Sequence, residues 1–135
     1  MIVLYASAAV DWLLQTSAGQ SIEKRIYSRN ETLHAPHLLD LEVTRVLRRL
    51  ALQGGVPQVV LTRRFSDLLD LRITRYPDLV LLPRIWQVRH NLSAYDAAYI
   101  VLAETLGATL VTRDGRLAQL RPRSWSLCPR PPVTP

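Results

Sequence analysis

Three acidic residues that lie far apart along the chain have the side chains and the positions to do chemistry: Glu42, Asp96 and Asp114. Carboxylates that converge from distant segments can hold a hard divalent cation or act as general bases. Asp114 follows the apolar run ATLVT after one arginine, so its side chain should lie where a strand ends. The dipeptide Asp114-Gly115 is equally typical of an ordinary turn, and spacing alone does not separate the two interpretations.

Asp96 lies near the start of the segment SAYDAAYIVLAETLG, which has the pattern of a helix. Ser93 and Asp96 form the S-x-x-D pattern of a capping box, and an acid in the first turn complements the helix dipole. Asp96 also shares a helix face with Tyr99, Ile100 and Ala103, and this face should be buried. Because an unpaired buried carboxylate is costly, we expect Asp96 to have a partner. A cap, a site, or both would explain this acid.

Glu42 borders the apolar stripe of another expected helix, one position before Val43 and four before Val46. It therefore does not point fully to water. Its alternative role is an ordinary helix ion pair with Arg45 or Arg49, worth about 0.2–0.5 kcal/mol.

The elements that must position these acids alternate along the chain. Strands are expected at Ile2–Tyr5, Thr32–Ala35, Arg72–Tyr76, Ala108–Thr112 and Ser124–Cys128. Helices are expected at Ser7–Leu14, Ser17–Ser28 (with Ser17 and Gln20 as a capping box), His37–Gln53, Pro57–Leu69, Asp78–His90 and Ser93–Leu106, with a turn at Gly115–Leu120. This order predicts an α/β fold in which helices cover both faces of a parallel central sheet of about five short strands. Functional groups gather at the carboxyl edge of such a sheet.

The composition fits one globular domain with a polyanionic or acidic partner. The chain has 135 residues, with 17 basic against 11 acidic residues and a net charge of +6, and Lys24 is its only lysine. Arginine suits phosphates, which favours RNA or an acidic protein, although a codon bias towards arginine would give the same excess. The single cysteine, Cys128, cannot form an internal disulfide. The apolar stretch 97–111 is too short to span a bilayer, and we expect no leader peptide and no membrane contact.

Three segments together carry a specific resemblance: MIVLYAS, APHLLDLEV and SAYDAAYIVLAETLGATLVTRDGRL. They resemble a PIN domain, and more narrowly the VapC-type toxins of bacterial toxin–antitoxin pairs. The resemblance covers the chain to about Cys128, which implies a PIN domain at residues 1–128 and a proline-rich C-terminal tail at 129–135. It implies a three-layer α/β/α fold and a type II toxin that acts as a Mg²⁺- or Mn²⁺-dependent endoribonuclease.

The resemblance also implies site residues, position by position. Glu42, Asp96 and Asp114 match three of the four acids that hold the metal and carry catalysis in that family, where a metal-bound water hydrolyses RNA phosphodiesters. Ser7 and Thr112 match nearby polar positions that can support ligands or waters. Arg113, beside Asp114 at the expected mouth of the site, is a candidate phosphate contact.

Tyr5 departs from the family pattern, because this chain reads Tyr5-Ala6-Ser7 where the family reads D-A-S. That aspartate is usually the central metal ligand, whereas a phenol with an unperturbed pKa of about 10 is neutral and bulky. Asp11 lies too far along its helix to substitute, and Asp40 projects from a different helical face than Glu42. We therefore expect low nuclease activity. The alternative function is a catalytically inactive PIN-fold binding module that retains antitoxin or RNA contact.

The expected partners follow from the same resemblance. They are a VapB-type antitoxin, whose tail would lie over the acidic pocket and could place an arginine in it, and an RNA substrate (tRNA, rRNA or mRNA). A homodimer, a hetero-oligomer with the antitoxin and a cytoplasmic location are also expected. Other side chains are interpreted as structural or inert: His34, His37, His90, Trp12, Trp86, Trp125 and Cys128. A DNA-binding regulator is a weaker alternative, since no helix pairs a tight turn with a basic recognition face.

Overall fold

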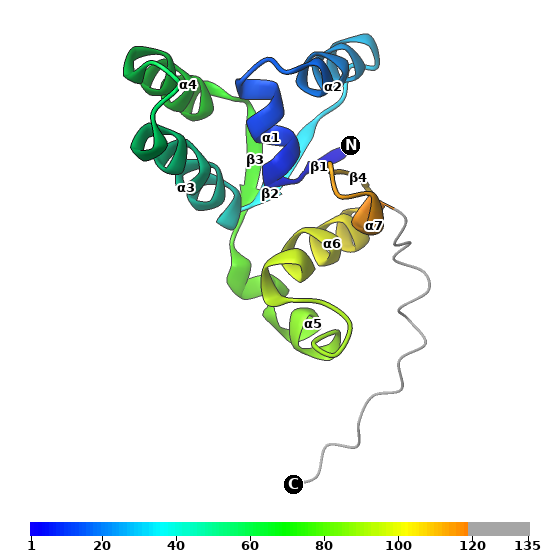
Figure 1. Cartoon of the computed structure of the whole chain (residues 1–135). Coiled ribbons are helices and arrows are strands. Elements are labelled where there is room, and N and C mark those ends of the chain that lie inside the picture. The colour runs from blue at the N-terminus through cyan, green and yellow to red at the C-terminus, as the bar shows by residue number, and fades with distance from the viewer. Residues whose placement is uncertain (119–135) are drawn as a thin grey trace, which may run out of the picture.

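The computed structural model describes residues 1–118, in which strands and helices alternate (Figure 1). The strands are β1 (Ile2–Leu4), β2 (Leu33–Pro36), β3 (Ile73–Tyr76) and β4 (Thr109–Val111). The helices are α1 (Ala6–Leu13), α2 (Ser17–Ser28), α3 (Leu38–Gln53), α4 (Gln58–Asp70), the 3-10 helix η1 (Asp78–Leu81), α5 (Leu82–Gln87), α6 (Ala94–Leu106) and α7 (Gly115–Ala118). The expected strand Ser124–Cys128, Trp125 and the tail 129–135 lie outside the described residues.

The four strands form one parallel sheet in the order β3-β2-β1-β4. Ile2 of β1 pairs with Leu33 of β2 on one side and with Thr109 of β4 on the other. The chain moves outward from β1 to β3 and then returns past β1 to β4. Because such crossovers are right-handed, α1–α4 lie on one side of the sheet, and α6 lies on the other with α5 packed outside it, as Figure 1 shows. The predicted α/β fold with a parallel, two-sided sheet is confirmed.

The reversal of strand order puts a switch point between β1 and β4. The backbone amide of Tyr5, just after β1, donates to the carbonyl of Val111 at the end of β4, over 3.0 Å. The segments that follow these two strands therefore start side by side, at the edge where open α/β sheets bind ligands.

The core lies on both faces of β1, whose residues Ile2, Val3 and Leu4 are fully buried. Helix α6 contacts β1, β2 and β4 and is buried from Ala97 to Ala103. Its ends are those that the sequence predicts: the Ser93 side chain caps the first turn, and Gly107 adopts the left-handed conformation after the last. No helix within residues 1–118 is long and apolar enough to cross a membrane.

Two predicted helix boundaries are wrong. The N-cap of α2 is Thr16 rather than Ser17, because the Thr16 hydroxyl accepts from the Gly19 amide at 3.1 Å. The predicted helix 78–90 is divided into η1 and α5, with Pro83 in the first turn of α5. Proline is tolerated in a first turn, where its missing amide has no helical partner, and it is unfavourable inside a longer helix.

Helices α1 and α2 approach each other closely at Gly19. A Cβ at this position would lie 1.9 Å from the carbonyl oxygen of Asp11 and 2.8 Å from the Cα of Trp12. These are backbone atoms, which cannot move aside as the end of a side chain could. The contact between the two helices therefore requires glycine here.

We predict that Gly19→Ala lowers the free energy of unfolding by about 2 kcal/mol or more, because the added methyl overpacks a rigid helix contact. Urea denaturation measures this change. Gly115→Ala is the matched control, because a Cβ at Gly115 has no atom within 4 Å, and it should leave stability nearly unchanged. Equal stability of the two variants would contradict the close packing of α1 on α2.

Candidate active site

The side chain of Tyr5 lies against the first turn of α6, where its hydroxyl donates a hydrogen bond to Oδ1 of Asp96. The two residues are 91 positions apart in the sequence. The Tyr5 ring also packs on Tyr99, with 4.3 Å between ring centroids and a tilt of 45°. The end of β1 and the start of α6 are thus joined by one polar contact and one aromatic contact.

Asp96 has both of the roles that its sequence context allowed. Its backbone amide donates to the Ser93 hydroxyl at 3.2 Å, which is the N-cap contact. Its carboxylate faces Tyr5, so the acid also belongs to the group of side chains at the sheet edge. The expected partner of this carboxylate is therefore a phenol from β1.

Glu42 approaches the same place from α3, and its Oε1 is buried without a hydrogen-bond partner in the described part of the chain. Burial raises the pKa of Glu42, and the negative charge of Asp96 raises it further, while the Tyr99 hydroxyl and Arg45 partly offset this. None of the ion pairs within residues 1–118 includes Glu42. The expected helix ion pair with Arg45 or Arg49 is thus not formed as a close contact, although the charge of Arg45 still acts on the pKa of Glu42.

Asp114 lies in the loop after β4, which is held by two side-chain oxygens. The Thr112 hydroxyl accepts from the Asp114 amide at 3.0 Å, and the Ser7 hydroxyl accepts from the Arg113 amide at 3.2 Å. Oδ1 of Asp114 accepts from the Arg116 amide at 2.9 Å and so begins α7. Asp114 is therefore the cap of a short helix that starts at Gly115, rather than part of an ordinary turn. Its carboxylate is also close enough to Tyr5 for its charge to affect the phenol.

Tyr5 stays neutral in this setting. Burial raises the pKa of its phenol well above the ordinary value of 10.0, and the hydrogen bond and negative charge of Asp96 raise it further. The charges of Glu42 and Asp114 act in the same direction. Three carboxylates from α3, α6 and the β4–α7 loop therefore act on one phenol, which supplies a proton donor but no negative charge.

The carboxylates as they stand do not fit a divalent cation. Mg²⁺ requires oxygen ligands that face a common point. Oδ1 of Asp96 accepts from Tyr5, and Oδ1 of Asp114 accepts from backbone amides of α7. Within residues 1–118, no three Asp, Glu, His or Cys side chains are arranged to hold a metal ion.

Two polar side chains of this region were not recognised as site residues from the sequence. Tyr99 is fully buried, and burial and the nearby Glu42 raise the pKa of its phenol, yet its hydroxyl has no aligned partner among the described residues. Asp78, two residues after β3, adds to this rise in the pKa of Tyr99 and has a buried Oδ1. The position of Asp78 just beyond a strand was a usable signal, as it was for Asp114.

Other predicted contacts have different outcomes. Arg113 forms an ion pair with Asp11, 3.0 Å from Nε to Oδ2, and its phosphate contact stays a prediction. Asp40 pairs with Arg75 of β3, 2.7 Å from Nε to Oδ2. His34 is buried and lies 2.7 Å from the Tyr76 hydroxyl, which confirms a structural role. Trp86 does not pack in the core: it is exposed and stacks with Arg89.

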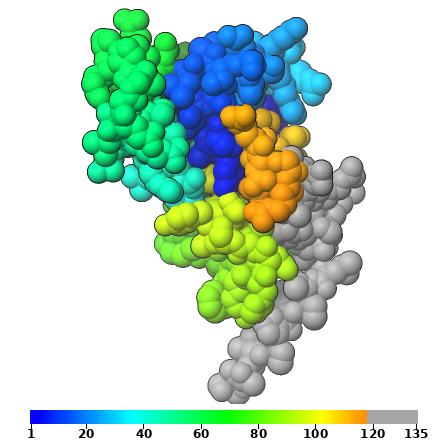
Figure 2. Space-filling view, viewed as in Figure 1, coloured from blue at the N-terminus to red at the C-terminus, as the bar shows by residue number. Residues whose placement is uncertain are grey.

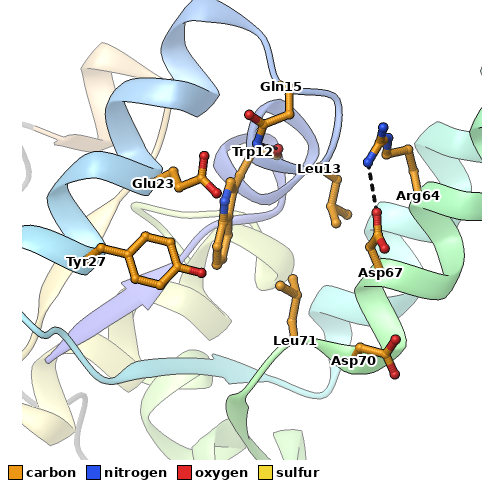
Figure 3. A pocket seen from close by; sticks show the side chains of 9 residues that line it. All are labelled: Trp12, Leu13, Gln15, Glu23, Tyr27, Arg64, Asp67, Asp70 and Leu71. Atoms are coloured by element: carbon orange, nitrogen blue, oxygen red, sulfur yellow. Dashed lines mark hydrogen bonds and ion pairs between the residues drawn. The ribbon is translucent and has the colours of Figure 1, made fainter.

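A separate hollow of about 340 Å³ lies between α1, α2 and α4 (Figure 3). Figure 3 shows the indole of Trp12 beside Tyr27 and Glu23, with Leu71 below and the Arg64–Asp67 ion pair at one side. Leu71 precedes β3, so this hollow lies towards the amino edge of the sheet. None of the candidate acids lines it.

Comparison with known proteins agrees with this geometry. The PIN domain family model matches residues 2–121. Ribonuclease VapC9 of Mycobacterium tuberculosis is 43% identical over 118 residues, which cover 87% of this chain and 89% of that protein. Ribonuclease VapC12 of the same organism is 40% identical over 128 residues, covering 88% and 91%. The crystal structure of PAE2754 from Pyrobaculum aerophilum superposes with a TM-score of 0.64 at 28% identity, covering 86% and 76%.

The chain thus has a parallel α/β fold with acids at its switch point, and most of its length is similar to PIN-domain ribonucleases. The chain belongs to the PIN-domain family, and within it to the VapC ribonucleases.

Glu42 generates a prediction about pH. Because folding raises the pKa of Glu42, its contribution to stability is present at low pH and is lost as the pH rises through the raised pKa. Glu42→Gln should therefore be more stable than the wild type at about pH 8, by roughly 0.5–1 kcal/mol, and this advantage should shrink towards about pH 5. Urea denaturation with EDTA at both pH values measures it. Glu23→Gln, on α2, controls for charge loss, and an equal advantage at both pH values would contradict the prediction.

Proposed function

We propose that this chain is the toxin component of a type II toxin–antitoxin system, built on an Mg²⁺- or Mn²⁺-dependent endoribonuclease that hydrolyses RNA phosphodiester bonds, and that Tyr5 impairs its activity. The observation that carries the proposal is the hydrogen bond from the Tyr5 hydroxyl to Asp96. This hydrogen bond lies at the switch point of the sheet. The similar proteins of the PIN family are named ribonucleases. The net charge of +6 favours an RNA partner, whether tRNA, rRNA or mRNA.

We assign the catalytic and metal-binding role in this lineage to Glu42, Asp96 and Asp114. If these residues held a divalent cation, it would supply Lewis-acid chemistry for a water molecule and for the attacked phosphate. In this chain Tyr5 engages Asp96 and adds no negative charge, so the three carboxylates lack the fourth anion of the family pattern. Ser7 and Thr112 support the site by holding the loop that carries Asp114.

A second candidate function follows from the same observation. If the phenol excludes the cation altogether, the chain is a PIN-fold binding module that retains antitoxin or RNA contact without cleavage. The neutral state of Tyr5 favours this alternative, because a phenol with a raised pKa does not become an anionic ligand at physiological pH.

The partner that we propose is a VapB-type antitoxin, in a hetero-oligomer formed with a toxin homodimer in the cytoplasm. The tail of this antitoxin would lie over the acidic pocket of Glu42, Asp96 and Asp114. The hollow in Figure 3 is a further contact surface for the same partner, because Trp12, Tyr27 and Leu71 provide apolar area and the acids Glu23 and Asp70 line it. An RNA substrate would be repelled by these acids, whereas a cationic, partly apolar segment of a protein would be attracted.

We predict that Tyr5→Asp raises metal-dependent RNA cleavage and Mn²⁺ affinity about 100-fold or more, since it restores an anionic oxygen ligand and removes the phenol. Tyr5→Phe is the matched control: it keeps the ring and its bulk, removes the hydrogen bond to Asp96, and should gain neither. Cleavage of a labelled RNA in Mg²⁺ or Mn²⁺ and Mn²⁺ titration by EPR give the two readouts.

Two further variants test the assignment of the acids. Asp96→Asn and Glu42→Gln, each combined with Tyr5→Asp, should return cleavage to the level of the wild-type chain. Robust metal-dependent cleavage by the wild type, equal to that of Tyr5→Asp, would overturn the proposed impairment. No cleavage by either protein, with RNA binding intact, would support the binding module instead.

A further inference from the structure

Asp11 is a buried carboxylate that the proposed chemistry does not use. It lies in α1, five residues before Thr16, the N-cap of α2, and only 5% of its surface is exposed. The Thr16 hydroxyl donates to its Oδ1 at 3.0 Å. A buried carboxylate that keeps its charge needs a cationic partner, because an unpaired one is strongly destabilising.

That partner is Arg113, which lies 102 positions later in the sequence. Its Nη1 donates to Oδ1 of Asp11 at 3.2 Å, and its Nε lies 3.0 Å from Oδ2 as an ion-pair contact. The guanidinium therefore contacts both carboxylate oxygens, a geometry that suits arginine and that lysine does not reproduce. Figure 2 shows the β4–α7 segment, in orange, packed against α1, in dark blue.

The backbone of Arg113 is anchored on the same helix. Its amide donates to the Ser7 hydroxyl at 3.2 Å, so both the side chain and the backbone of Arg113 are bound to α1. The next residue is Asp114, whose own amide is bound by Thr112. The loop that carries this candidate site acid is thus fixed on α1 at Arg113, next to the contacts that Asp114 itself makes with Thr112 and with the amides of α7.

We propose that Asp11 and Arg113 form a positioning pair that fixes the β4–α7 loop on α1 and thereby sets where the carboxylate of Asp114 lies. Arg113 then acts through Asp114 rather than by binding RNA phosphates. The proposal rests on the proposed function only in that Asp114 is taken to be a site acid. The pair joins the loop to α1, and α1 is in turn held against α2 by the Thr16 cap and the close approach of Gly19 to Asp11. These contacts therefore help to fix the position of Asp11.

The first test is local and independent of catalysis. Amide hydrogen exchange of Arg113 and Asp114, followed by NMR in the wild-type background, should accelerate at least about tenfold in Asp11→Asn and in Arg113→Gln. Asp11→Asn keeps the shape and the acceptor for Thr16 while removing the charge. Arg116→Gln is the matched control: Arg116 is exposed and lies 3.9 Å from Asp114, so it controls for lost positive charge near that acid. It should leave both amides protected.

The second test reads the site itself, in the Tyr5→Asp background. Asp11→Asn and Arg113→Gln should each weaken Mn²⁺ binding and lower kcat by a similar factor. The double variant should lose little more than either single variant, because each substitution removes the same interaction between Asp11 and Arg113. Arg113→Lys should behave like Arg113→Gln. If Arg113 instead binds phosphate, Arg113→Gln would raise KM and reduce the salt dependence of RNA binding, while Asp11→Asn would not.

The outcomes separate the two proposals. If the exchange rates of both amides are unchanged in Asp11→Asn and Arg113→Gln, the positioning pair is overturned, regardless of the measured Mn²⁺ affinity. Failure of Tyr5→Asp to bind Mn²⁺ with the pair intact overturns the proposed metal site, while the exchange experiment still decides the role of Asp11 and Arg113. Accelerated exchange together with unchanged Mn²⁺ affinity also contradicts the proposal, since the loop would then move without moving Asp114.

Discussion

The hydrogen bond between the Tyr5 phenol and the Asp96 carboxylate is the interaction on which the properties of this site depend. It is possible because β1 lies in the middle of a parallel sheet, next to β4, so that the residue after β1 meets the first turn of α6. Three carboxylates brought to one edge repel one another and require either a cation or a proton donor. In this chain the donor is covalently part of the protein, and it keeps its proton because burial and the surrounding charge raise its pKa.

The supporting structure explains why the acids can be held in this strained electrostatic arrangement. Asp96 is fixed by the Ser93 cap, and Asp114 is fixed by the amides of α7. Glu42 is the least satisfied of the three, with a buried oxygen that has no aligned partner within residues 1–118. Functional sites often retain such unfavourable groups at the expense of stability. The rest of the fold, with its fully buried β1 and α6, provides the rigidity that keeps them in place.

Much of the fold could be predicted from the sequence, because its signals are local. Ser93 and Gly107 mark the ends of α6, and the apolar run after Met1 marks β1 as a buried strand. The missed features depend on contacts between distant residues: Arg113 pairs with Asp11 across 102 positions, and the hydroxyl of Tyr99 faces Glu42 from another helix. The error at Thr16 has a different cause, since Thr16 and Ser17 are both good cap residues and only the geometry of the preceding turn selects one.

The family pattern could identify Tyr5 as a departure, but it could not say what the phenol does there. Its partner is fixed only when β1 and α6 are packed together, and in the function that we propose the phenol and a cation compete for Asp96. The most direct measurement of that competition is the anomalous difference density of a crystal of this chain grown with Mn²⁺. We expect the Tyr5 hydroxyl to remain on Asp96, with no manganese peak among Glu42, Asp96 and Asp114. An ordered Mn²⁺ ion bound by two or more of these carboxylates would contradict the central claim.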